Sequence, residues 1–218
     1  MPAGAAARTQ TYTYLSTDDL YPTGGAGTYG PAYRYPSTVT VSGLPRKVTK
    51  VRLTILGYQS ARPTDTDLVL SGPNGKNVLL MADACGTNGL QNDNWTFDDA
   101  APTYLSAVGP CPNYQAASFK PSGYLGDDQA DMTQFGATGP PPPYLNALRF
   151  FKGSPANGSW RLYALDDTDG YLGFDIAAWA LTLDVKTGKR AAALKKCKKI
   201  KQPKSRQRCI RKAKKLPE

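Results

Sequence analysis

The chain of 218 residues contains no histidine and a single glutamate, Glu218. Without an imidazole it has no Ser-His-Asp or Cys-His relay and no His-ligated zinc or haem. Long apolar runs are also missing, since the longest covers residues 176–181 and a bilayer span needs about 18 residues. Any chemistry must therefore come from carboxylates, hydroxyls, Lys, Tyr or Cys, and no transmembrane helix is expected.

Charge is divided unevenly along the chain. Residues 186–218 hold 15 of the 27 Lys and Arg and one acid, whereas residues 1–185 hold 12 bases and 16 acids, all of them Asp. The formal charge of +10 therefore combines a body of −4 with a tail of +14. Because Asp is poor in helix interiors and common in turns, the body is predicted to be loop-rich and non-helical.

The pattern of the body predicts a series of short strands. Residues 48–55 place apolar side chains at Val48, Val51, Leu53 and Ile55 with polar ones between, the pattern of a strand with one buried face. Further strands are expected at 9–15, 37–41, 67–71, 77–81, 95–97, 145–151, 159–165 and 174–185. Clusters of Gly, Pro, Asn and Asp separate them, so an all-β fold is predicted, an antiparallel β-sandwich or jelly roll.

The tail differs in kind from the body. Residues 191–200 and 209–216 each place small or apolar side chains at helical spacing, with Pro203 and Ser205 between them as a helix stop and a possible N-cap. We therefore divide the chain into a flexible N-terminal segment with a possible first strand (1–30), a β-sandwich (31–185) and a basic αα-hairpin (186–218).

The four cysteines favour disulfides over a metal site. None has CxxC spacing, so zinc is not expected. We predict one bridge between Cys85 and Cys111 in the long loop region and one between Cys197 and Cys209, which are equidistant from the hairpin turn. The alternative is four free thiols in an intracellular protein.

The first eight residues show neither the basic nor the apolar region of a signal peptide, so we expect an intracellular chain or one that begins downstream of its true N-terminus.

Aspartates are the candidate metal ligands. Calcium takes six to eight oxygens, which Asp side chains and loop carbonyls supply. A first candidate set lies at strand ends, and a second set occupies one turn: Asp65, Asp67, Asp83, Asp98 and Asp99, then Asp166, Asp167 and Asp169. The spacing matches no EF-hand, and turn formation alone is the alternative. A glycosidase pair would need a carboxyl with a raised pKa, and polar Asp-rich loops offer no reason for one.

Two further groups are candidates for binding. Clustered cations bind polyanions because contact releases counterions; the tail offers Lys195, Lys196, Lys198, Lys199, Lys201, Lys204, Arg206, Arg208, Arg211, Lys212, Lys214 and Lys215. No aromatic side chain is interleaved for base stacking, so specific nucleic-acid recognition is not expected. An anionic surface is the preferred partner. The alternative is that the tail is a solvated appendage without a ligand.

The loop tyrosines are candidates for a carbohydrate or peptide platform, or they rigidify loops: Tyr104, Tyr114, Tyr124, Tyr144 and Tyr171.

Six blocks carry a resemblance to a known family. They are 37–45 (STVTVSGLP), 47–51 (KVTKV), 65–75 (DTDLVLSGPNG), 78–83 (VLLMAD), 95–100 (WTFDDA) and 157–167 (NGSWRLYALDD) with 173–183 (GFDIAAWALTL). In this order they resemble the P domain (P/Homo B) of proprotein convertases, the kexin- and furin-like subtilases, in its bacterial form. The resemblance covers about 150 residues.

The resemblance implies a galactose-binding-like jelly roll that normally follows a subtilisin-like catalytic domain and stabilises it. The catalytic Asp, His and Ser of such proteases lie in that other domain, and nothing in this sequence corresponds to them. We therefore expect a secreted, monomeric, non-catalytic module with calcium as its only candidate cofactor. The alternatives are the C-terminal part of a subtilisin-like serine endopeptidase and a polyanion- or carbohydrate-binding module.

Overall fold

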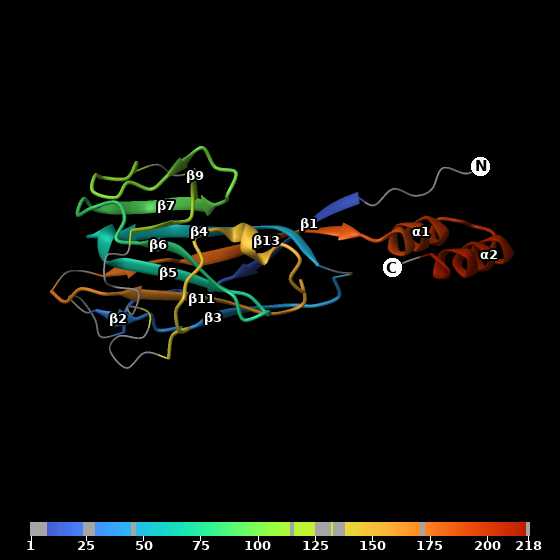
Figure 1. Cartoon of the computed structure of the whole chain (residues 1–218), viewed down its shortest axis with the longest axis horizontal. Helices are drawn as coiled ribbons and strands as arrows, with labels where there is room; N and C mark the ends of the chain where they lie inside the picture. Colours follow the sequence, from blue (N-terminus) through green and yellow to red (C-terminus); the bar gives the residue numbers. More distant parts are fainter. Residues whose placement is uncertain are drawn as a thin grey trace.

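The computed structural model describes residues 8–23, 29–44, 47–113, 116–124, 132, 138–170 and 173–216. Two β-sheets pack face to face as a sandwich, and two short helices follow them (Figure 1). In Figure 1 the helices lie beyond one end of the sandwich, next to the start of β1 and the end of β13. The predicted β-sandwich with a C-terminal helical hairpin is confirmed.

The first sheet has the strand order β1-β13-β4-β7-β9-β8, and β12 also pairs with β4. Its strands are β1 (Arg8–Ser16), β13 (Ala178–Thr187), β4 (Val48–Ser60), β7 (Leu90–Phe97), β9 (Ala117–Lys120), β8 (Thr103–Tyr104) and β12 (Phe174–Asp175). β1 pairs with β13 from Arg8↔Thr187 to Ser16↔Trp179. The sheet thus begins at Arg8, inside the segment that the sequence set apart from the sandwich.

The second sheet has the order β10-β6-β5-β11-β2, and β3 also pairs with β11. Its strands are β10 (Ser122–Gly123), β6 (Asn77–Ala82), β5 (Thr66–Ser71), β11 (Gly158–Asp166), β2 (Gly30–Pro31) and β3 (Ser37–Val41). All six residues of β5 are buried. The outer face of this sheet is covered by a second apolar cluster that includes Val69, Tyr163 and Met132, which explains why β5 shows no polar alternation.

The main core lies between the sheets and follows the alternation of β4. Val51, Leu53 and Ile55 are buried, while the residues between them are partly exposed. Trp95, Trp160 and Trp179 are all fully buried, as expected for packing side chains. Trp160 meets the ring of Phe151 edge-on, with centroids 5.0 Å apart.

Two expectations about the strands are corrected. The sheets are mixed, because β9 runs parallel to β7 and β8, and β10 runs parallel to β6. Residues 145–151 do not form a strand: Leu145 makes a single bridge with Val78, and Leu148–Phe151 form the 3-10 helix η3. The Asp99 carboxylate accepts hydrogen bonds from the backbone N–H of Leu148 and Arg149, which favours the helical turn.

The hairpin consists of α1 (Lys189–Lys198) and α2 (Pro203–Lys214). Pro203 begins α2 instead of separating the helices, because proline at the first helical position loses no hydrogen bond. Gln202 is the N-cap residue, and the hydroxyl of Ser205, predicted as a possible cap, donates to the Gln202 side chain over 3.2 Å. In the described part of the chain, neither helix has the length and apolar character needed to cross a membrane.

Candidate functional site

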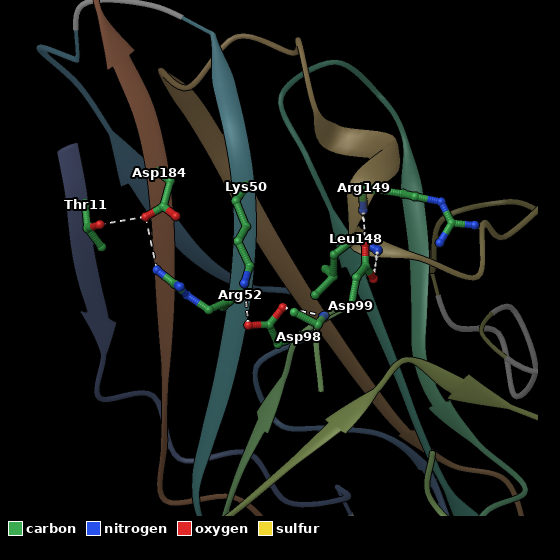
Figure 2. Close-up of polar contacts among 9 residues, drawn as sticks. Thr11, Lys50, Arg52, Asp98, Asp99, Leu148, Arg149 and Asp184 are labelled. Atoms are coloured by element: carbon green, nitrogen blue, oxygen red, sulfur yellow. Dashed lines mark hydrogen bonds and ion pairs between the residues drawn. The ribbon is translucent and has the colours of Figure 1, made fainter. Parts of the chain in front are cut away.

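Asp98 and Asp99, two members of the first predicted calcium set, are used by the fold itself. Figure 2 shows Asp98 turned toward Lys50 of β4 and Asp99 toward the backbone of η3. The Lys50 ammonium lies 2.7 Å from an Asp98 oxygen, and Asp98 also caps the amide of Ala100. These two carboxylates do not meet the other predicted ligands.

Carboxylates from both predicted sets lie instead at one end of the second sheet, where β5 starts and where β6 and β11 end. This acidic end consists of Asp65, Asp83, Asp166 and Asp167, and their charges influence one another. Arg62 contributes the opposite charge, with its Nε 3.3 Å from an Asp65 oxygen. The remaining predicted ligands lie outside the group: Asp67 is buried within β5, and Asp169 is exposed.

Two carboxyls of the acidic end hold their protons more tightly than an ordinary Asp. Burial raises the pKa of Asp65 to about 6, against the lowering effect of Arg62 and with help from Asp167 and Asp83. Burial likewise raises the pKa of Asp166 to about 7, although the backbone N–H of Thr168 opposes the shift. Polar loops offered no reason for such shifts, but both residues are at most 4% exposed. The same burial keeps these carboxyls from a polymeric substrate.

The described residues do not provide a calcium site of the expected kind. Within them, no three or more Asp, Glu, Cys or His side chains converge closely enough to hold a metal ion. The five aspartates of the first set are divided between the acidic end, β5 and the contacts around β4 and η3. Calcium binding therefore stays a prediction from the sequence.

Both predicted disulfides are confirmed. Cys85 pairs with Cys111, and Cys197 pairs with Cys209. The first bridge ties the segment after β6 to the loop that precedes β9. The second connects α1 and α2 within the hairpin, so each structural unit of the chain has one crosslink.

The interior of the hairpin is small. Cys197 and Ala213 are fully buried, and Leu194, Ile200 and Ile210 are partly buried. The guanidinium of Arg206 donates to the backbone carbonyls of Ile200 and Lys201 over 2.9 and 3.1 Å. Arg206 was predicted as a binding residue, but these contacts give it a role in satisfying the carbonyls after α1.

The twelve hairpin cations predicted to bind polyanions are all exposed. None of the twelve forms an ion pair with any residue that the structure describes. The body contrasts with this, because its exposed face in the first sheet carries paired charges: Asp184 accepts from Thr11 and lies 3.0 Å from Arg52 (Figure 2). The hairpin thus presents a concentrated and unneutralised positive charge.

Two of the predicted loop tyrosines, Tyr104 and Tyr124, are exposed. Tyr104 is 58% exposed, but Tyr124 and Tyr144 each donate a hydrogen bond to a backbone carbonyl. Tyr114 and Tyr171 lie outside the described residues. Sequence reasoning missed Tyr21 and Tyr33, whose exposed rings stack in parallel with centroids 5.7 Å apart.

Tyr21, on which Tyr33 stacks, lines a cleft of about 540 Å³. Tyr21 forms one wall, and Gln59 of β4, Gln91 of β7 and Asp175 of β12 supply amide and carboxylate groups. The amide of Gln59 donates to Asp175 over 3.2 Å. No local pattern could have indicated this site, because its residues come from four separate parts of the chain.

Comparisons with known proteins give matches only to solved structures. No protein-family model matches the chain, and no curated protein matches it. The chain is structurally similar to the Aeromonas sobria serine protease in complex with the chaperone, with 13% identity and a TM-score of 0.39, over 83% of this chain and 28% of the matched one. A structure of the serine protease of Aeromonas sobria gives 14% identity and a TM-score of 0.36, over 80% and 27%. The chain therefore spans less than a third of the matched proteins.

Proposed function

We propose that this protein is a secreted, non-catalytic P-domain-like module that stabilises or targets a partner such as a subtilisin-like protease, and that its hairpin attaches to anionic surfaces. The observation that supports the proposal is the hairpin itself, in which none of the twelve exposed cations forms an ion pair with a residue that the structure describes. Two disulfides favour an oxidising, extracellular location.

The arrangement of the resembling blocks supports the module part of the proposal. The blocks fall on β3, β4, β5, β6, β7, β11, β12 and β13, which include the central strands of both sheets. A partner domain would then contact a prefolded sandwich. The chain has no His, so a His-based protease relay has no place in it, and proteolysis would belong to the partner.

The hairpin's role can be tested on heparin with the intact chain. Four cations at the C-terminal end of α1, including its C-cap residue Lys199, and four of α2 are changed to Gln together: Lys195, Lys196, Lys198, Lys199, Lys204, Arg208, Arg211 and Lys212. We expect the native chain to elute at high salt and the eightfold variant to elute near the void volume. Unchanged retention of a folded variant would contradict the attachment role.

The purified native chain should also leave casein intact, and turnover that co-purifies with it would contradict the non-catalytic assignment.

A second candidate function is favoured by the cleft beside Tyr21 and Tyr33. An exposed aromatic wall with amide and carboxylate groups is suited to a carbohydrate, because such a site combines an apolar surface with a few convergent polar groups. Affinity electrophoresis in neutral polysaccharides tests it. Retardation should be lost in Tyr21→Ala and kept in Tyr104→Ala, which removes another exposed tyrosine that does not line the cleft.

A further inference from the structure

The cations of α2 are ordered in a way that those of α1 are not. Four of them and the C-cap residue after them follow the spacing i, i+4, i+7, i+8 and i+11: Lys204, Arg208, Arg211, Lys212 and Lys215. At 3.6 residues per turn they fall within about 100° of the helix circumference and extend for about 16 Å. We call these five residues the α2 stripe. Lys195, Lys196, Lys198 and Lys199 of the α1 end cover about 160° by the same geometry.

The α2 stripe faces away from the rest of the hairpin. Cys209 and Ala213, which lie on the other side of α2, contact α1 through the disulfide and through packing. All five stripe residues are exposed and unpaired within the described chain. Arg206 is on the inner side, where it donates to the carbonyls after α1. The stripe is thus a free surface held in place by the contacts behind it.

The stripe is unfavourable for the helix that bears it. Lys204 and Arg208, Arg208 and Lys212, and Arg211 and Lys215 are like charges four residues apart, which destabilise a helix. No acid lies between Lys186 and Pro217 to relieve them. A ligand that brings a row of negative charges would remove this repulsion, so the arrangement favours an anionic partner over bare solvent.

The chemistry of the stripe selects among polyanions. Insertion into a membrane would need several exposed apolar side chains beside the cations, but Leu194, Ile200 and Ile210 are partly buried, and Leu216, at 38%, is the one exposed large apolar side chain in the described part of the hairpin. Stacking on the bases of a single strand would need aromatic rings, and none lies between Lys186 and Glu218. A single line of cations that includes two arginines suits a single line of phosphates, which guanidinium groups bind through two hydrogen bonds.

We propose that the α2 stripe binds an unbranched phosphate polymer along its backbone, through charge and without reading any base or sugar. This proposal rests on the attachment role of the hairpin and names the surface and the ligand class for it. Each phosphate contact with a single-stranded polyanion lowers the slope of log K against log salt concentration by about 0.7, so five contacts predict a slope of about −3.5.

The test compares two variants of equal charge in the full chain, with long-chain inorganic polyphosphate as the probe. The stripe variant carries Lys204→Gln, Arg208→Gln, Arg211→Gln and Lys212→Gln, and the matched variant carries Lys195→Gln, Lys196→Gln, Lys198→Gln and Lys199→Gln. We expect the stripe variant to bind more than tenfold more weakly at low salt, with a slope near −0.7, because one contact of the five remains. The matched variant should keep a slope near −3.5.

Three outcomes would overturn the proposal. Equal losses in both variants would mean diffuse charge instead of a stripe, and would leave the attachment role intact. Stronger binding to vesicles containing anionic lipid than to polyphosphate would mean a membrane partner. Native binding by the eightfold variant would contradict the attachment role as well.

Two controls accompany the test. Circular dichroism at 222 nm checks that each variant is folded, and the double variant Lys204→Arg and Lys212→Arg, which preserves the charge, should bind as the native chain does.

Discussion

The sandwich and the hairpin hold together by different means. The sandwich buries a continuous core that includes three tryptophans, and two of its ion pairs, Lys50–Asp98 and Arg52–Asp184, connect neighbouring segments of the first sheet. The hairpin fully buries only Cys197 and Ala213 among its described side chains, and none of its twelve exposed cations forms an ion pair with a residue that the structure describes. Packing therefore stabilises the first unit, whereas a crosslink stabilises the second, where helices of about ten residues would be marginal in water.

The largest effect should come from the sandwich core. Trp160→Ala removes a fully buried ring that packs on Phe151 and donates to the Ala156 carbonyl over 3.0 Å. We expect a loss of about 3–5 kcal/mol in the free energy of unfolding, measured by urea denaturation. Leu15→Ala, at a β1 residue that is 58% exposed, is the control and should change it by less than about 0.5 kcal/mol. An equal effect of the two changes would contradict the packing described for this core.

The next effect should be confined to the hairpin. Replacing Cys197 and Cys209 by Ser opens a 12-residue separation, which costs about 3 kcal/mol in the chain-entropy model. All three tryptophans lie in the sandwich, so their fluorescence reports that unit, while circular dichroism at 222 nm reports the helices. Helical signal should fall without a change in the fluorescence midpoint.

The other disulfide provides the converse experiment. Replacing Cys85 and Cys111 by Ser should lower the fluorescence midpoint and leave the helical signal in place. A joint loss of both signals in either variant would show that the sandwich and the hairpin unfold together. That result would contradict the separate stabilisation of the two units.

A smaller effect is expected from pH, and only in the sandwich. Because burial raises the pKa of Asp65 to about 6 and that of Asp166 to about 7, the folded state binds more protons than the unfolded state between about pH 4 and 7. The contribution of these two carboxyls to the free energy of unfolding should therefore be complete below about pH 4, and it should be lost as the pH rises through 6 and 7. The urea midpoint should be higher at pH 5 than at pH 8, and Asp65→Asn should reduce that difference.

The same measurement tests the calcium prediction. At pH 8 both carboxyls are ionised, so a bound calcium ion would raise the midpoint, by an amount set by ligand linkage. A rise in calcium that a chelator reverses would support a site at the acidic end, and an unmoved midpoint would count against it. The hairpin, which has no carboxylate between Lys186 and Pro217, should not respond to either change.

Local patterns predicted the parts of the fold that local forces determine. The alternation of residues 48–55 depends on one buried face, and β4 forms there. Residues 145–151 are as apolar as a strand, but Asp99, about 50 positions away, binds the amides that begin η3. The short parallel strands β8, β9 and β10 likewise depend on distant partners, so no sequence pattern indicated them.

The candidate sites divide in the same way. Cys197 and Cys209 could be paired from their distance to one turn, and the structure pairs them. The aspartates could be grouped only by position in the chain, whereas the acidic end takes members from both groups and adds Arg62. The stacking of Tyr21 on Tyr33 depends on loops that no periodicity describes.

The junction between the two units has a mechanical consequence. Gly188 is the one residue between β13 and α1, so tension on the hairpin passes directly into β13. That strand lies between β1 and β4 and pairs with both along nearly its whole length. Its hydrogen bonds run across the strand axis, so a pull along the axis acts on all of them at once instead of opening them one after another. A hairpin attached to a surface would thus be anchored to the sandwich through its most fully paired strand.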